Sequence, residues 1–197
     1  MLTLDQLRAE VLGCSRCPLW RSRTNAVPGE GSRRCPMFVG EAPGANEDAE
    51  GRPFVGAAGK FLTKLIEDVL GLSRTEVYIT NLVKCRPPKN REPTPEEEAA
   101  CWSYLEREIS LVKPTILVTL GRHSSAYVLS RGQINFKSIE SVRGRTFKVK
   151  LGEETATVFP TYHPAAALYN PSLKEELESD FRKLKAFLGG GLEKYLI

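Results

Sequence analysis

Four short apolar segments with the composition of buried strands alternate along this chain with longer segments of helical periodicity. The strand-like segments span residues 36–40, 77–80, 114–120 and 156–159. Strands that alternate with helices pair in parallel, and helices then cover both faces of the sheet. The predicted fold class is therefore α/β, a three-layer α/β/α sandwich around a central, mostly parallel four-stranded sheet.

The clearest helix signal follows the second of these segments. Thr94 has the residue type of an N-cap, Pro95 suits the first turn, and Glu97 stands at the capping-box position. The apolar residues that follow recur at helical spacing and place a cysteine on the inward face: Cys101, Leu105, Ile109 and Val112.

Weaker patterns fill in the remaining elements. An apolar stripe over 61–69 predicts a helix that Gly71 ends, a further helix is expected near 122–130, and a last amphipathic helix follows Pro171. Residues 134–151 resemble a β-ribbon or a loop with alternating basic positions.

Length and composition restrict the class of protein. The 197 residues suit one domain over 1–197, and 41% hydrophobic with 26% charged residues is typical of a globular protein. No apolar run reaches the roughly 18 residues that a membrane span requires, and the N-terminus lacks the apolar core of a signal peptide. We expect an intracellular monomer without a membrane anchor.

Basic residues gather in three loop regions, although the net charge is only +4. Such loops suit contacts with phosphate groups, and the alternative is that they are solvated faces offset by acidic helices. The three groups lie within 16–34, 84–91 and 137–150.

Three polar loops directly follow three of the predicted strands. They contain Gly40-Glu-Ala-Pro-Gly44, the Asn81-Leu-Val-Lys-Cys85 block, and Tyr162-His163-Pro164. The carboxyl ends of parallel strands meet at one edge of a sheet, where α/β proteins bind ligands. The sequence therefore predicts one site built from these loops.

Four of the five cysteines have the arrangement of a metal-ligand set. Cys14 and Cys17 form a CxxC pair, Cys85 and Cys101 follow, and Cys35 is left over. Cysteines of intracellular proteins more often bind metals than form disulfides. An iron–sulphur cluster or zinc fits the set. Zinc fits less well because Cys101 follows Cys85 by sixteen positions, without a second tight pair.

Taken together, these blocks resemble the family 4 uracil-DNA glycosylases, the iron–sulphur branch of their superfamily. The resemblance extends over nearly the whole chain, through the CxxC pair, GEAPGxxED from Gly40, GxPFVGxAG from Gly51, TNLVKCRPP from Thr80, and His163-Pro164. It implies a glycosylase that flips uracil out of DNA and hydrolyses the N-glycosidic bond in base-excision repair, leaving an abasic site.

The resemblance also implies roles for single residues. The cluster would be a structural [4Fe–4S] held by Cys14, Cys17, Cys85 and Cys101. Phe54 would stack on uracil. Asn81 would pair with O4 and N3–H of the base, because one amide offers both an acceptor and a donor.

His163 would donate a hydrogen bond to uracil O2 as the bond breaks. Other glycosylases of the superfamily carry a water-activating aspartate where this chain has Ala42. Glu41 is then the nearest carboxylate, with the loop backbone at Gly40 and Ala42 beside it. Glu47 is a second candidate for the water, or it crowds the 5-methyl position and excludes thymine.

DNA contacts are expected from Lys84 and Arg86. The family's last motif usually has leucine four residues after the histidine and a basic residue two further on. Here Ala167 and Tyr169 stand at those positions. The wedge that fills the vacated stack is therefore predicted to be Leu168 or Tyr169, and one phosphate contact is missing.

Three other interpretations remain at this point. One is a broader-range glycosylase of the same superfamily, which a small residue at position 81 would favour. The second is a non-catalytic iron–sulphur module that binds nucleic acid, and the third is a flavodoxin-like electron carrier. The expected partner is uracil-containing DNA, single- or double-stranded. The resemblance adds a sliding clamp as a candidate, although no motif in the chain locates that contact.

Overall fold

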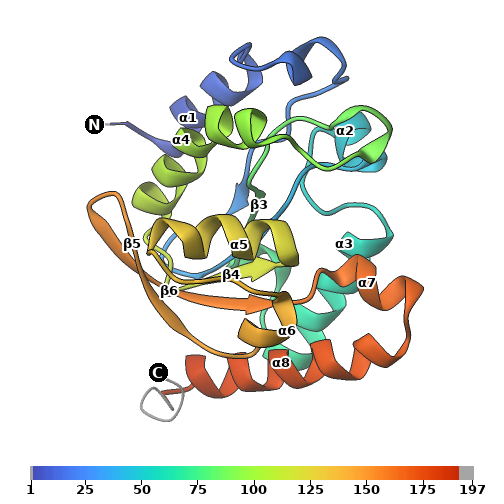
Figure 1. Ribbon diagram of the computed structural model, residues 1–197, viewed down its shortest axis with the longest axis vertical. Coiled ribbons are helices and arrows are strands. Elements are labelled where there is room, and N and C mark those ends of the chain that lie inside the picture. Colours follow the sequence, from blue (N-terminus) through green and yellow to red (C-terminus); the bar gives the residue numbers. More distant parts are fainter. Residues whose placement is uncertain (1, 191–197) are drawn as a thin grey trace.

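The computed structural model of the chain describes residues 2–190. Within that range six strands form one sheet in the order β1-β3-β2-β4-β6-β5 (Figure 1). The strands are β1 (Glu30–Gly31), β2 (Pro36–Gly40), β3 (Tyr78–Asn81), β4 (Ile116–Leu120), β5 (Phe147–Leu151) and β6 (Glu154–Thr161).

The four inner strands, β3, β2, β4 and β6, are parallel, which confirms the sandwich and its parallel centre. The sheet is wider than the four strands predicted, because β1 and β5 add antiparallel edges. β1 has two residues, too few for a periodic pattern to reveal it.

Helices cover both faces of the sheet. In Figure 1, α4 and α5 lie above the sheet and α8 lies below it, beside η2. The helical segments are α1 (Leu4–Leu12), η1 (Pro18–Arg21), α2 (Ala45–Glu50), α3 (Ala57–Lys64), η2 (Leu65–Leu70), η3 (Arg74–Glu76), η4 (Pro88–Asn90), α4 (Pro95–Val112), α5 (Arg122–Arg131), α6 (Ile139–Val142), α7 (Pro164–Tyr169) and α8 (Ser172–Leu188). None of the helices in residues 2–190 is long and apolar enough to cross a membrane.

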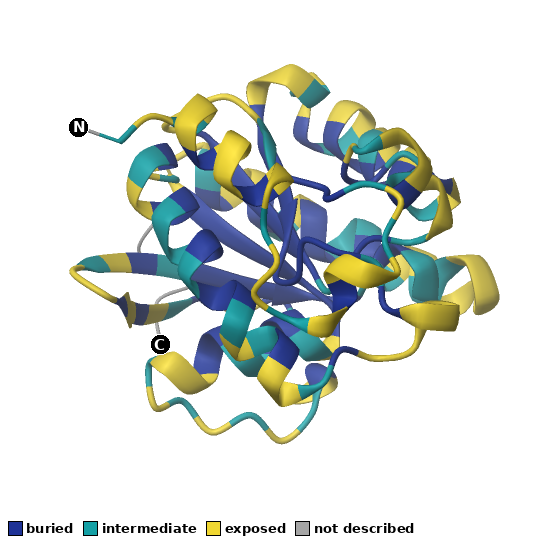
Figure 2. Ribbon diagram, turned by 90° about the horizontal axis from the view of Figure 1, so that it is seen from above, coloured by how far each residue is buried: buried dark blue, intermediate teal, exposed yellow. Residues whose placement is uncertain are grey.

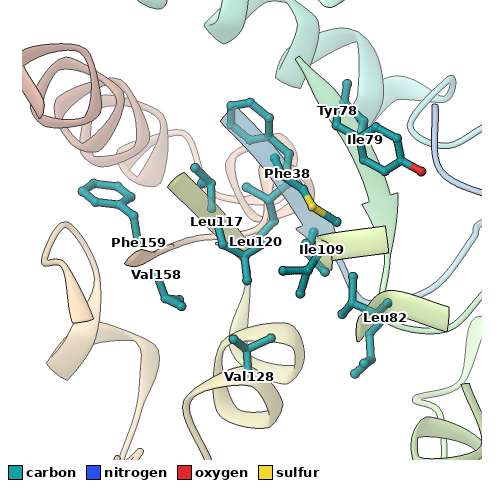
Figure 3. Close-up of a cluster of buried hydrophobic side chains, with 14 of the residues drawn as sticks. Phe38, Tyr78, Ile79, Leu82, Ile109, Leu117, Leu120, Val128, Val158 and Phe159 are labelled. Atoms are coloured by element: carbon teal, nitrogen blue, oxygen red, sulfur yellow. The ribbon is translucent and has the colours of Figure 1, made fainter. Parts of the chain in front are cut away.

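The hydrophobic core lies on both sides of the inner strands: β2, β3 and β4 are buried throughout, and β6 is buried over its last four residues (Figure 2). Figure 3 shows side chains of β2, β4 and β6 together with Ile109 of α4 and Val128 of α5. On the opposite face the ring of Phe38 stacks on Phe181 of α8, with centroids 5.9 Å apart. Burial on both faces explains why β2 and β4 are almost continuously apolar.

The predicted caps and stops are largely confirmed. The Thr94 side chain accepts from the backbone N–H of Glu97, which completes the capping box of α4. The stripe over 61–69 forms α3 and continues as the π-helical η2, which ends at Gly71 in the left-handed conformation. The prediction for 134–151 was only partly right, because this stretch contains the short helix α6 before β5.

Two neighbouring strand pairs end in register on the same edge of the sheet. Gly40 pairs with Asn81 at the ends of β2 and β3, and Leu120 pairs with Thr161 at the ends of β4 and β6. All four parallel strands therefore deliver their following loops to one place. The predicted single domain over 1–197 includes Met1 and 191–197, which lie outside the described residues.

Candidate active site

A pocket of about 350 Å³ opens at this edge of the sheet. Every side chain predicted to contact the base lines it. The lining residues are Glu41, Ala42, Pro43, Gly44, Glu47, Phe54, Ala58, Asn81, Pro87, Asn90, Arg91, His163 and Ala165. The three loops singled out from the sequence thus converge on one cavity, which is large enough for a small ligand.

Asn81 lines the pocket and is 2% exposed. The space for its amide comes from Gly40. A Cβ at position 40 would lie 2.4 Å from Asn81 Oδ1 and 2.6 Å from the ring of Phe54. Gly40 therefore contributes to the site by having no side chain, because both groups occupy that volume.

Phe54 forms a wall of the pocket from an unusual backbone conformation. Its φ is +53°, which a bulky residue rarely adopts without support from its surroundings. Arg74 supplies this support from one side, since its guanidinium donates to the carbonyl oxygens of Phe54 (3.0 Å) and Pro53 (2.5 Å). Gly59 allows α3 to approach, because a Cβ there would lie 2.0 Å from the Phe54 carbonyl.

Glu47 supports the same loop from the other side. Its Oε1 accepts from the backbone N–H groups of Val55 (2.9 Å) and Gly56 (2.8 Å), and its Oε2 accepts from Gly44 (3.2 Å). One carboxylate thus ties the loop after β2 to the loop before α3. Because both of its oxygens accept hydrogen bonds from backbone N–H groups, Glu47 holds the two pocket loops together and is not a free base.

His163 follows β6 and faces Phe54, with ring centroids 5.6 Å apart. Its Nδ1 accepts a hydrogen bond from the backbone N–H of Ala165 at 3.1 Å. Burial lowers the pKa of His163 to about 4, although the charge of Glu47 opposes this. The ring is therefore neutral at pH 7, and because Nδ1 is an acceptor, the single proton lies on Nε2.

Glu41 lines the pocket and its backbone carbonyl accepts from Val83 N–H at 2.9 Å. Burial raises the pKa of its carboxyl group, and the charges of His123 and Arg122 partly offset this. His123 itself contacts Glu92 Oε1 at 2.9 Å through Nε2. A carboxyl group with a raised pKa in a pocket is a recurrent feature of active sites.

The four predicted cluster ligands lie on three segments: Cys14 and Cys17 between α1 and η1, Cys85 after β3, and Cys101 on α4. Cys85 and Cys101 are buried, whereas Cys14 and Cys17 are half-buried. Burial raises the pKa of Cys85; Arg23 opposes this, and Cys17 and Cys14 are near enough to raise it further. Cys35 is buried separately and donates to the Ser32 carbonyl oxygen at 3.2 Å.

The surroundings of these thiols fit an iron–sulphur cluster. Arg23 donates to Cys85 Sγ at 3.0 Å and the backbone N–H of Lys84 donates to Cys101 Sγ at 3.3 Å, and hydrogen bonds to sulphur help to tune such clusters. Among the described residues, no three His, Cys, Asp or Glu side chains converge as they would around a single metal ion. A four-iron cluster is larger than one ion and accepts more widely spaced thiolates.

One of the predicted DNA contacts is wrong. Lys84 is 1% exposed and its ammonium group lies 2.7 Å from Glu108 Oε2 in the interior, so it cannot reach a phosphate. Arg86 is half-buried and donates to Asn90 Oδ1 at 2.7 Å. Leu168 and Tyr169, at the end of α7, are 49% and 89% exposed. Their role as the wedge stays a prediction.

Several residues of the site were not predicted. Pro87, Asn90 and Arg91 also line the pocket, and Asn90 has a positive φ of 55°. Their position was the available signal, because Pro87 lies within the TNLVKCRPP block and Asn90 and Arg91 follow it closely. No sequence pattern indicated the role of Arg74, because its contact with Phe54 joins residues twenty positions apart.

Comparison with known proteins identifies the family. The model of the uracil DNA glycosylase superfamily matches residues 31–187. The type-4 uracil-DNA glycosylase of Sulfurisphaera tokodaii is 57% identical over 186 residues, which is 94% of this chain and 84% of that protein. This chain belongs to the type-4 uracil-DNA glycosylases. Relatives of the same name from Saccharolobus solfataricus (54% identity; 95% of this chain, 88% of that protein) and Archaeoglobus fulgidus (45%; 96% and 95%) agree with it.

In this type-4 chain, Gly40→Ala is expected to lower the free energy of unfolding by about 1–3 kcal/mol, because the new methyl group overlaps Asn81 and Phe54. Denaturant unfolding of both proteins measures the difference. Gly189→Ala is the matched control, since its Cβ would come no closer than 3.4 Å to another atom. Equal losses in the two variants would contradict the close packing at position 40.

Proposed function

We propose that this protein is a uracil-DNA glycosylase that flips uracil out of DNA and hydrolyses its N-glycosidic bond. The observation that carries the proposal is the composition of the pocket: an asparagine amide, an aromatic wall and a neutral histidine line one cavity of about 350 Å³. The names and near full-length coverage of the relatives support the same conclusion.

Recognition would follow from the Asn81 amide and the Phe54 ring. A flipped base would stack on the Phe54 ring, while the Asn81 amide meets its Watson–Crick edge. Uracil offers an acceptor at O4 and a donor at N3, whereas cytosine offers a donor and an acceptor. An amide held in one orientation therefore selects uracil. The close approach of Gly40 to Asn81 Oδ1 supports a restricted orientation.

His163 would stabilise the departing base. As the bond between C1′ and N1 breaks, its electron pair moves onto uracil, and negative charge develops at O2. The neutral Nε2–H is a preorganised donor for that charge. Water adds to C1′ and loses a proton, and uracil N1 ultimately gains one, so that the products are free uracil and an abasic sugar.

Glu41 is the residue we propose to orient the water. It lines the pocket and burial raises the pKa of its carboxyl group, whereas the oxygens of Glu47 are engaged with backbone N–H groups. Ala42 offers no carboxylate, so the chain lacks the aspartate found elsewhere in the superfamily. A reaction in which the sugar develops positive charge before the water attacks needs little base strength.

The proposed DNA surface surrounds the pocket mouth. Arg86 would contact a phosphate, and the exposed Leu168 and Tyr169 would fill the space that the flipped base leaves. Single-stranded and double-stranded DNA that contains uracil would both fit this surface. The described residues 2–190 provide no location for a contact with a sliding clamp.

The proposed cofactor is a [4Fe–4S] cluster held by Cys14, Cys17, Cys85 and Cys101. Its role would be structural, because its ligands come from the chain between α1 and η1, from the chain after β3 and from α4. The cluster would thereby join three segments that are far apart in sequence, as a structural metal does.

The proposed activity is tested by uracil release from a labelled oligonucleotide with one central uracil. The anaerobically purified protein should release uracil and leave an alkali-labile site. His163→Ala should lower the rate by about 10²–10³-fold, the usual cost of removing one transition-state donor. Asn81→Ala should lower it too, whereas a thymine oligonucleotide should stay intact.

Tight DNA binding without release by the unmodified protein would contradict the proposal and favour a non-catalytic binding module. Release of thymine or hypoxanthine at comparable rates would favour the broader-range glycosylase.

The proposed cluster is tested by substitution of one of its ligands. Cys85→Ser should lower the visible absorbance of the purified protein and its melting temperature, because a ligand that joins β3 to α4 is lost. Cys35→Ser is the matched control and should keep the absorbance, since Cys35 is not a proposed ligand. Full absorbance and unchanged melting in the Cys85 variant would contradict the cluster assignment.

A further inference from the structure

Lys84, whose predicted role in DNA binding is wrong, has a complete set of partners in the interior. Its Nζ donates to three acceptors: the Asn81 carbonyl oxygen (2.6 Å), Thr80 Oγ1 (2.6 Å) and Glu108 Oε2 (2.7 Å). The side chains of Lys84 and Glu108 are each 2% exposed. An ammonium group has three N–H donors, so all of them are used without water.

Glu108 completes the network from helix α4. Its Oε2 also accepts from Thr80 Oγ1 at 3.0 Å, and its Oε1 accepts from the backbone N–H of Gly29 at 3.2 Å. The network therefore joins α4 to the last two residues of β3 and to the chain before β1. Figure 1 shows α4 and β3 as neighbouring elements.

The Asn81 backbone is held on its other side by the loop after β2. The N–H groups of Leu82 and Val83 donate to the carbonyl oxygens of Gly40 and Glu41, both at 2.9 Å. The chain that leaves β3 is therefore held on two sides. Its N–H groups donate to the carbonyl oxygens of Gly40 and Glu41, and the Asn81 carbonyl oxygen accepts from Lys84. Rotation of this peptide would turn the Asn81 side chain.

A contribution to folding stability does not by itself explain the buried ion pair of Lys84 and Glu108. Removing two charges from water is costly, and apolar replacements of a buried ion pair are often as stable or more stable. A polar network that is fully satisfied can instead fix one conformation.

We propose that Lys84, held by Glu108, is a positioning residue that fixes the orientation of Asn81 for reading the base. The proposal rests on the proposed function in one respect, namely that Asn81 contacts uracil. Lys84 touches no substrate, and it acts through the Asn81 carbonyl.

The test is a double-mutant cycle between the ion pair and Asn81. The variant Lys84→Met/Glu108→Gln removes both charges, keeps the side-chain volumes similar and leaves the Asn81 carbonyl without its donor. We expect kcat/KM for uracil release to fall about 10- to 100-fold, the scale of a small misplacement in an active site. In the Asn81→Ala background the same double substitution should lower kcat/KM by less than about 3-fold, because the effects of substitutions at residues that act together are not additive.

A matched control lies one position away on α4. Arg107 and Glu10 form an ion pair at 2.6 Å that joins α4 to α1. Arg107→Met/Glu10→Gln should change kcat/KM by less than about 3-fold in both backgrounds. Melting temperatures are measured for all variants, so that a loss of folded protein is separated from a loss of activity.

Thr80→Val is the second variant, in case the double variant does not fold. It keeps the shape of the side chain and removes only the hydroxyl that bridges Lys84 and Glu108. We expect about a 3-fold loss of kcat/KM, which should again vanish in the Asn81→Ala background.

Three outcomes would overturn the proposal. An unchanged kcat/KM in the folded variants would do so. Equal fold-losses in the unmodified and the Asn81→Ala backgrounds would also do so, because they would make the network merely structural. Full activity of Asn81→Ala by itself would overturn the proposed reading of uracil as well, and this distinguishes the failure of the function from the failure of the positioning role.

Discussion

The site depends on two glycines at the ends of the middle strands of the sheet. A Cβ at Gly40 would lie 2.4 Å from the Asn81 amide oxygen, and a Cβ at Gly121 would lie 2.9 Å from the Cβ of His163. Because β2 ends at Gly40 and Gly121 directly follows β4, no side chain at these two positions fills the space that Asn81 and His163 occupy. The parallel sheet thus supplies both the place of the pocket and the space inside it.

Around that space, charged side chains hold backbone rather than substrate. Glu47 accepts from N–H groups of two loops, Arg74 donates to the carbonyls of Pro53 and Phe54, and Lys84 donates to the Asn81 carbonyl. Groups fixed before the base arrives need no rearrangement during the reaction, which is the condition for electrostatic catalysis. The left-handed conformation of Phe54 is tolerated because these contacts determine it.

The sequence predicted the elements whose signals are local. The α4 helix follows from Thr94, Pro95 and Glu97, and the convergence of the three loops follows from parallel strand order. It could not predict contacts between distant segments. In the sequence Lys84 is one of several neighbouring basic residues and resembles a surface lysine. In the structure it is buried and donates to Glu108, 24 positions further on. The sequence predicts Glu47 as a group for the substrate or the water, because no local pattern reveals that its oxygens accept from backbone N–H groups of another loop.

The central claim is that a neutral His163 presents Nε2–H to the base, and nitrogen NMR of the histidine rings as a function of pH tests it directly. The account predicts that Nδ1 is unprotonated and Nε2 protonated at pH 7. It predicts further that the ring stays neutral as the pH falls through 5, with charge appearing only near the lowered pKa of about 4. The second histidine, His123, is assigned by its absence from a His123→Gln sample. A His163 ring that carries its proton on Nδ1, or that is already charged near pH 6.5, would contradict the account.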